Sequence, residues 1–136
     1  MFLRIGINAD SSIINGDTVI LDKMLSVFST VGFSHAEIPI HGLDCVINGI
    51  LRPERLADTL KILRKYPLAY TIHAPDQLNL ADSSHPEIHA VALRSTIDFA
   101  AEIGASIVVY HGSFLEKGSA EAHEAEKEEV EEGAAE

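Results

Sequence analysis

The sequence has little cysteine and no long hydrophobic run. Its 136 residues contain a single cysteine, Cys45, so an internal disulfide framework is excluded. We expect this thiol to act as a small, semi-buried apolar side chain. No stretch of about 18 apolar residues is present, which excludes a membrane-spanning helix. The first ten residues, MFLRIGINAD, lack the pattern of a signal peptide, so a cytoplasmic protein is expected.

Positive charge is also scarce. Ten lysine and arginine residues stand against 21 aspartate and glutamate residues, giving a net charge of −11. Without a basic patch, binding to nucleic acid is not expected. Much of the negative charge lies in residues 121–136, which hold eight glutamates and one lysine. We therefore expect a folded domain over residues 1–118 and an acidic helix or disordered tail over residues 119–136.

The common short motifs of catalysis and cofactor binding are missing as well. The sequence contains no GxGxxG, P-loop, GxSxG, HExxH or CxxC pattern. Dinucleotide binding, nucleotide hydrolysis, serine hydrolysis and zinc-finger folding therefore have no support in the sequence.

Four short apolar runs are what the sequence does contain, and they predict strands buried on both faces of a parallel sheet. They are spaced about 35 residues apart, with a helical pattern in each interval. This alternation is typical of parallel α/β architecture. Because crossovers are right-handed, the carboxyl ends of such strands share one edge, where ligands bind. The runs cover residues 3–8, 36–40, 68–73 and 106–111.

Three helices are expected between these strands. The first runs from Thr18 to Val31 and stops at Gly32, and the other two begin at Pro53 and Pro86. Each has apolar residues at helical spacing, which predicts its buried face. These residues are Leu21, Leu25 and Phe28 in the first helix, Leu56, Leu60 and Leu63 in the second, and Leu93, Ile97 and Ala100 in the third.

Histidines end the third and fourth predicted strands. His73 closes the run in YTIHAP, and His111 closes the run in VVYHGS. Because neighbouring strands lie about 4.8 Å apart, the two imidazoles could share a metal ion or a substrate hydroxyl. We therefore predict His73 and His111 as metal ligands, the alternative being that each binds only a loop carbonyl.

Three more residues are candidates for substrate binding. Glu37 lies within a predicted strand, where an unpaired carboxylate would be costly, so it is a site residue or faces a polar layer. Asp10 and His41 lie at loop edges beside the same strand ends. The remaining histidines are expected at the surface: His35, His85, His89 and His123.

Residues 70–113 resemble the xylose-isomerase-like TIM-barrel superfamily, and the match covers roughly residues 3–115. This superfamily includes sugar and sugar-phosphate isomerases and epimerases, and also endonuclease IV-type abasic-site nucleases (AP endonuclease family 2). The resemblance rests on HAP at 73–75, NLA at 79–81, the helical segment at 90–105 and VVYHGS at 108–113. It implies the N-terminal (βα)₄ half of a TIM barrel, with four parallel strands and flanking helices.

The resemblance also implies a chemistry. In the endonuclease branch, the histidines that match His73 and His111 are zinc ligands, whereas in many isomerases these positions face the substrate. We expect a metal-dependent sugar or sugar-phosphate isomerase or epimerase, with zinc or manganese as cofactor and a small sugar as substrate. A zinc-dependent abasic-site endonuclease-like hydrolase is the alternative. Asp76 stands where that branch usually has an aromatic residue, which weighs against DNA as the substrate.

A whole TIM barrel needs about 250 residues, so the sequence predicts half a barrel and half of its site. A half barrel leaves two sheet edges and an apolar inner face exposed. We therefore expect a homo-oligomer, or a C-terminal half that is supplied by another chain or is missing. A third hypothesis is an inactive half barrel that serves as an assembly module.

Overall fold

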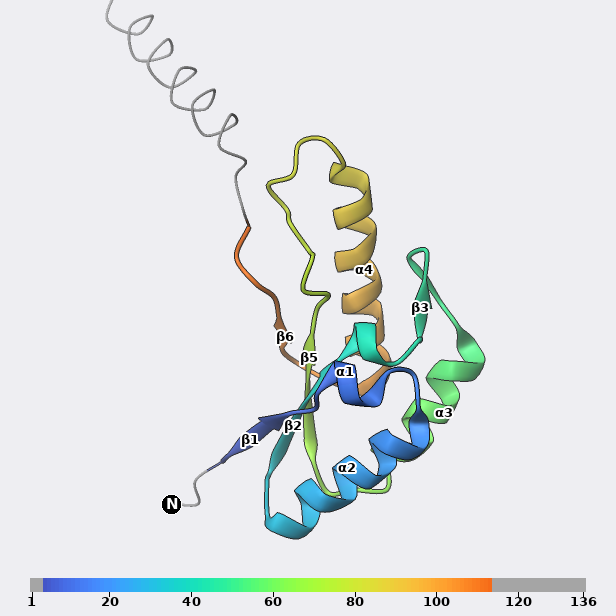
Figure 1. Ribbon diagram of the computed structural model, residues 1–136, viewed down its shortest axis with the longest axis vertical. Helices are drawn as coiled ribbons and strands as arrows, with labels where there is room; N and C mark the ends of the chain where they lie inside the picture. The colour runs from blue at the N-terminus through green and yellow to red at the C-terminus, as the bar shows by residue number, and fades with distance from the viewer. Residues whose placement is uncertain (1–3, 114–136) are drawn as a thin grey trace, which may run out of the picture.

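A four-stranded parallel sheet organises the fold. The computed structural model describes residues 4–113 (Figure 1). In this range the sheet has the order β1-β2-β5-β6, and every pair of neighbours is parallel. The predicted parallel α/β class is confirmed, whereas the half barrel stays a prediction. The strands are Gly6–Asn8 (β1), His35–Pro39 (β2), Ala69–His73 (β5) and Val108–Val109 (β6).

The last strand is shorter than the sequence predicted. β6 ends at Val109, so His111 lies in the following loop and is not the last residue of a strand. The register explains the early end, because Val109 pairs with His73, the last residue of β5.

The helix Thr18–Val31 (α2) matches the prediction at both ends. Asp17 caps its first turn by accepting hydrogen bonds from two backbone N–H groups, and Gly32 ends it in a left-handed conformation with a φ of 98°. Its buried side chains are the predicted ones, Leu21, Leu25 and Phe28.

The helices Pro53–Leu63 (α3) and Pro86–Ile103 (α4) begin at the predicted prolines. The predicted stripe on α4 is partly wrong, because Ile97 is 51% exposed. Phe99 fills the core instead, and a residue two positions away on a helix points to nearly the opposite side. The buried residues of α4 are Ser95, Thr96, Phe99 and Ala100, and those of α3 are Thr59, Ile62 and Leu63.

Several short elements were not predicted. A one-turn helix, Ser11–Ile14 (α1), follows β1, and a 3₁₀ turn, Ile40–Gly42 (η1), follows β2. Val46–Ile47 (β3) and Ile50–Leu51 (β4) form a small antiparallel hairpin beside α4 (Figure 1). Its turn residues, Asn48 and Gly49, both have positive φ, as a type I′ turn requires.

The two faces of the sheet differ in character. Ala36, Ile38 and Ile72 point to the helical side and are fully buried. Alternation along the strands places Asn8 and Glu37 on the other face, where they are exposed or half-buried. The core is therefore built on one side of the sheet, and polar groups collect on the other.

Two predictions on individual segments have different outcomes. Cys45 is fully buried among apolar side chains, with its Sγ 3.3 Å from Thr59 Oγ1, as expected of a small core residue. The acidic segment 119–136 lies outside the described residues. Within residues 4–113, none of the helices combines the length and apolar character that a bilayer crossing requires.

Candidate functional site

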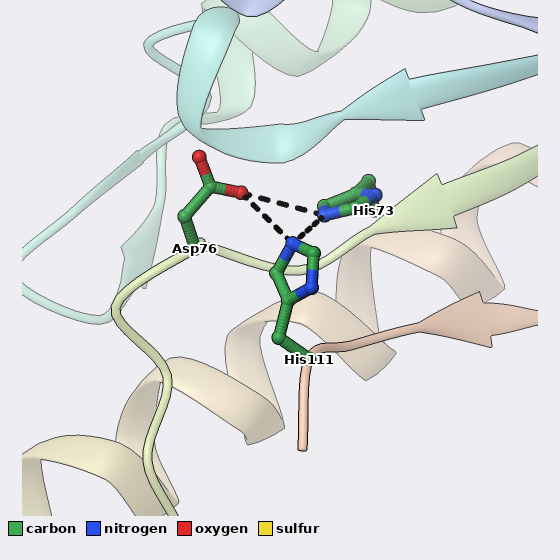
Figure 2. Close-up of side chains that lie close together, drawn as sticks. All are labelled: His73, Asp76 and His111. Carbon is green, nitrogen blue, oxygen red and sulfur yellow. Dashed lines mark hydrogen bonds and ion pairs between the residues drawn. The ribbon is translucent and has the colours of Figure 1, made fainter. Parts of the chain in front are cut away.

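Three side chains meet at the carboxyl ends of β5 and β6. His73 is the last residue of β5, Asp76 follows in the next loop, and His111 lies just after β6 (Figure 2). The Nε2 atoms of the two histidines are 3.2 Å apart. Asp76 Oδ1 lies 3.4 Å from His73 Nε2 and 3.6 Å from His111 Nε2. One nitrogen from each imidazole and one carboxylate oxygen therefore surround a common point.

These spacings suit a metal ion. Ligand atoms that lie about 2.0–2.2 Å from a tetrahedral zinc ion are about 3.3–3.6 Å from one another. Two imidazole nitrogens and a carboxylate oxygen are a donor set that zinc accepts and manganese tolerates. His111 and Asp76 are both more than half exposed, so a fourth coordination position would face solvent or a substrate.

Glu37 fixes the orientation of His73. Its Oε1 lies 2.7 Å from His73 Nδ1 and also accepts a 2.6 Å hydrogen bond from Asn8 Nδ2. An ionised carboxylate can only accept, so the Nδ1 atom carries the proton and the Nε2 lone pair points at the cluster. A carboxylate behind a ligating histidine is the usual outer support of a metal site.

The strand register brings these supporting residues together. Asn8 of β1 is paired directly with Glu37 of β2, and Pro39, two residues later, is paired with His73. Side chains two positions apart lie on the same face of a strand, so Glu37 and His73 are diagonal neighbours. The structure therefore places Glu37 against His73, on the polar face of the sheet.

Asp10 has a clear local role beside the cluster. Its Oδ1 accepts hydrogen bonds from Ser12 N at 2.8 Å and Ser12 Oγ at 2.6 Å, and caps α1. These bonds to Ser12 hold the pKa of the Asp10 carboxyl below its ordinary value. Asp10 also lines a small polar hollow of about 160 Å³ that includes the cluster, so it stays a predicted substrate contact.

His41 lies in η1, near the carboxylate oxygen of Asp76 that the other two histidines do not approach. Its Nε2 atom is 3.9 Å from Asp76 Oδ2, and its ring meets that of His73 edge-on at a centroid distance of 6.3 Å. Burial lowers the pKa of His41, and the charge of Asp76 opposes this shift only in part. The predicted site residues Asp10, Glu37, His41, His73 and His111 thus all lie at or beside one cluster.

Asp76 is a further candidate ligand, which was not predicted from the sequence. From the sequence, Asp76 was interpreted only as a difference from the endonuclease branch, which usually has an aromatic residue at this position. A local signal was available, because Asp76 follows His73 by three residues and Pro75 turns the chain between them. A carboxylate at that spacing from a strand-end histidine can fold back onto it.

The other histidines differ in their surroundings. His85 is 65% exposed, as predicted. His89 is not a surface residue: its side chain is 16% exposed, with Nδ1 accepting from Asn79 N at 3.1 Å and Nε2 3.1 Å from Asp82 Oδ2. His35 is half-buried beside Ser34 Oγ, and His123 lies outside the described residues.

Comparison with known proteins leaves the function to be argued from the side chains. No protein-family model matches the chain, and no curated protein matches it. The resemblance to xylose-isomerase-like barrels therefore stays a prediction from the residues that suggested it. Since one fold supports many chemistries, the site itself has to indicate the reaction.

Proposed function

We propose that this chain is a metal-dependent protein of the sugar or sugar-phosphate isomerase and epimerase type. Its divalent metal would be held by His73, Asp76 and His111. The observation that carries the proposal is the spacing of their three ligand atoms, between 3.2 and 3.6 Å. The position at the carboxyl edge of a parallel sheet, where such folds bind ligands, supports it further.

Each residue has a task in this proposal. Glu37, held by Asn8, keeps the Nε2 atom of His73 directed at the cluster. Asp76 contributes a negative charge that helps to balance the cation. When bound, a divalent metal supplies Lewis acidity toward a carbonyl or hydroxyl oxygen of the substrate. Asp10 and His41, on the wall of the polar hollow, would receive substrate hydroxyls.

A zinc-dependent abasic-site endonuclease-like hydrolase is the second candidate. The near-tetrahedral spacing favours it, because three protein ligands and one open position are typical of catalytic zinc. The charges nearby disfavour a polyanionic substrate, since Asp10, Glu37 and Asp76 all lie at this edge of the sheet. The isomerase or epimerase type is therefore preferred.

We also propose that the sheet is half of a barrel that a second copy of the chain completes. Among the described residues, β1 and β6 each pair with one neighbour only, so both edges of the sheet are unpaired. Unpaired edges favour association with another sheet. An inactive half barrel that serves for assembly would keep this association but would bind no metal.

Metal binding is the first test of the proposal. Native mass spectrometry of the chain with zinc or manganese is expected to show one ion per chain. The His73→Ala/His111→Ala double variant should lose it, because two of three ligands are gone, whereas His85→Ala should retain it as a matched control. Equal metal uptake by the double variant, or none by the natural chain, would contradict the proposal.

Activity distinguishes the two enzyme candidates. The metal-loaded chain is assayed for interconversion of a panel of aldoses and ketoses and their phosphates, and in parallel for cleavage of a duplex with one abasic site. Sugar interconversion that depends on His73 and His111 supports the preferred function. Abasic-site cleavage with the same dependence would replace it by the second candidate.

A further inference from the structure

A larger cavity lies beside the cluster of His73, Asp76 and His111. It has a volume of about 650 Å³ and lies between η1, the β3–β4 hairpin and α4. Cavities of about 300–1,000 Å³ with mainly apolar walls are typical of small-molecule sites. Its apolar walls come from Ile40, Val46, Pro75, Ile88, Val91 and Ala92.

The cavity and the cluster are neighbours at two points. His41 lines both the cavity and the polar hollow that contains the cluster. Pro75 lines the cavity, and the next residue, Asp76, is one of the three metal-ligating candidates. A molecule that fills the cavity therefore lies beside His41 and Pro75, next to the cluster.

The walls of the cavity are tied to each other. Ser95 Oγ on α4 lies 2.7 Å from the carbonyl oxygen of Gly49 in the hairpin turn, within hydrogen-bonding distance. Gly49 also packs so closely on Val91 that a side-chain carbon at this position would lie 1.9 Å from Val91 Cγ1. The hairpin is thus held against α4 before any ligand arrives.

Apolar side chains on α4 face water at this cavity. Ile88 is 63% exposed and Val91 is 46% exposed, although both line the cavity wall. An apolar ligand group would remove this surface from water, which is favourable. A free sugar would do so poorly, because its hydroxyl groups would lose water without gaining partners on such a wall.

We infer that the cavity binds an apolar group of the substrate while an oxygen-rich head lies at the metal cluster. The inference rests on the proposed function and narrows its substrate class. The ligand is a sugar or a similar hydroxy-carbonyl compound that carries an aryl or branched alkyl group. Substrate choice then depends on Ile88, Val91 and Ala92 as well as on the metal ligands.

The test compares two metal-chelating probes on the zinc-loaded chain. Acetohydroxamate and 3-phenylpropionohydroxamate share a head that binds zinc through two oxygens, and they differ in the apolar tail. Calorimetry gives both affinities, and native mass spectrometry verifies that zinc stays bound. The phenyl compound is expected to bind at least about tenfold more tightly, because its ring is buried in the cavity.

Variants on α4 assign that gain to the cavity. Ala92→Phe fills the cavity and Ile88→Ser makes its wall polar, so each should reduce the gain and leave acetohydroxamate binding unchanged. Ile97→Ser removes an exposed isoleucine of the same helix outside the cavity and should keep the gain. Equal affinity for the two probes, with zinc bound, overturns the inference and leaves the metal site standing. A chain that binds no zinc overturns both.

Discussion

At the scale of single residues, Glu37 is expected to act on the metal through His73. Glu37→Gln removes the negative charge from the side chain whose Oε1 lies 2.7 Å from His73 Nδ1. Loss of such an outer partner typically weakens metal binding by about 10- to 100-fold. We expect the zinc dissociation constant, measured by competition with a chromophoric chelator, to rise by at least about tenfold.

Glu54→Gln is the matched control for this change. Glu54 is an exposed glutamate in the first turn of α3, away from the cluster. The Glu54→Gln variant should leave the zinc affinity unchanged, although it alters the net charge by the same amount as Glu37→Gln. If both variants bind zinc as the natural chain does, Glu37 does not position the ligand.

A second residue-scale prediction concerns acid stability. Asp22 Oδ2 accepts a 2.7 Å hydrogen bond from Lys65 Nζ, and Asp22 Oδ1 accepts a 2.6 Å bond from Tyr66 Oη. The bond to Lys65, followed by that to Tyr66, lowers the pKa of Asp22 from its ordinary 3.8. A group with a depressed folded pKa stabilises the protein above its unfolded pKa, and this stability is lost as pH falls through the folded pKa.

Asp22→Asn should therefore lower the melting temperature at pH 7 by a few degrees. The difference from the natural chain should shrink as pH falls from about 4 through the lowered pKa of the folded Asp22 carboxyl, because this carboxyl then becomes neutral, as the asparagine always is. Thermal unfolding followed by circular dichroism from pH 7 to pH 2.5 measures this difference in melting temperature. The control is Asp98→Asn, at an exposed aspartate. A difference that persists undiminished at pH 2.5 would exclude this ionic contribution.

At the scale of elements, the β3–β4 hairpin depends on Gly49. Its φ is 75°, and an added side-chain carbon would lie 1.9 Å from Val91 Cγ1 on α4. Gly49→Ala should therefore combine left-handed strain of about 1–2 kcal/mol with a steric clash. We expect a loss of about 2 kcal/mol or more in the free energy of unfolding, measured by urea titration.

Gly32→Ala separates the two contributions. Gly32 has a φ of 98°, but nothing lies within 4 Å of the position that its side chain would occupy. This variant should therefore show the backbone strain alone and lose less stability than Gly49→Ala. Adding Val91→Ala to Gly49→Ala should restore part of the loss, and equal losses for both glycine variants would show that packing on α4 contributes nothing.

Features with local signals could be predicted from the sequence, whereas contacts between elements could not. The ends of α2 were predictable because Leu21, Leu25, Phe28 and Gly32 give local signals for its buried face and its end. His73 and His111 were placed near each other because parallel strands end at one edge. The contact of Asn8 with Glu37 depends on strand register, and the approach of Asp76 depends on the path of a loop, which are tertiary features.

Two further differences have physical explanations. Asn48-Gly49 is a strong local signal for a hairpin turn, but the flanking strands have only two residues each and give no strand pattern of their own. Ile97 was assigned to the core because it is apolar at helical spacing. Packing instead placed Phe99 in the core, which turned Ile97 to solvent.

At the scale of the whole molecule, the sheet edges that are unpaired within residues 4–113 predict self-association. Ile5 and Ile107 directly precede the edge strands β1 and β6 and are 51% and 54% exposed. A second copy could pair its β1 with β6 of the first and cover these side chains, which would close the sheets into one barrel. We expect analytical ultracentrifugation to show a dimer whose population rises with protein concentration.

Charges placed at the edges test this arrangement. Ile5→Lys and Ile107→Lys should each shift the chain to monomer by at least about tenfold in the dimer dissociation constant, because pairing would bury an unpartnered charge. Val27→Lys places the same charge on α2, at a valine that is 58% exposed, and should leave the dimer intact. A dimer that both edge variants leave unchanged would place the contact on another surface. A natural chain that stays monomeric at every concentration would mean that association with a second copy does not close the sheet.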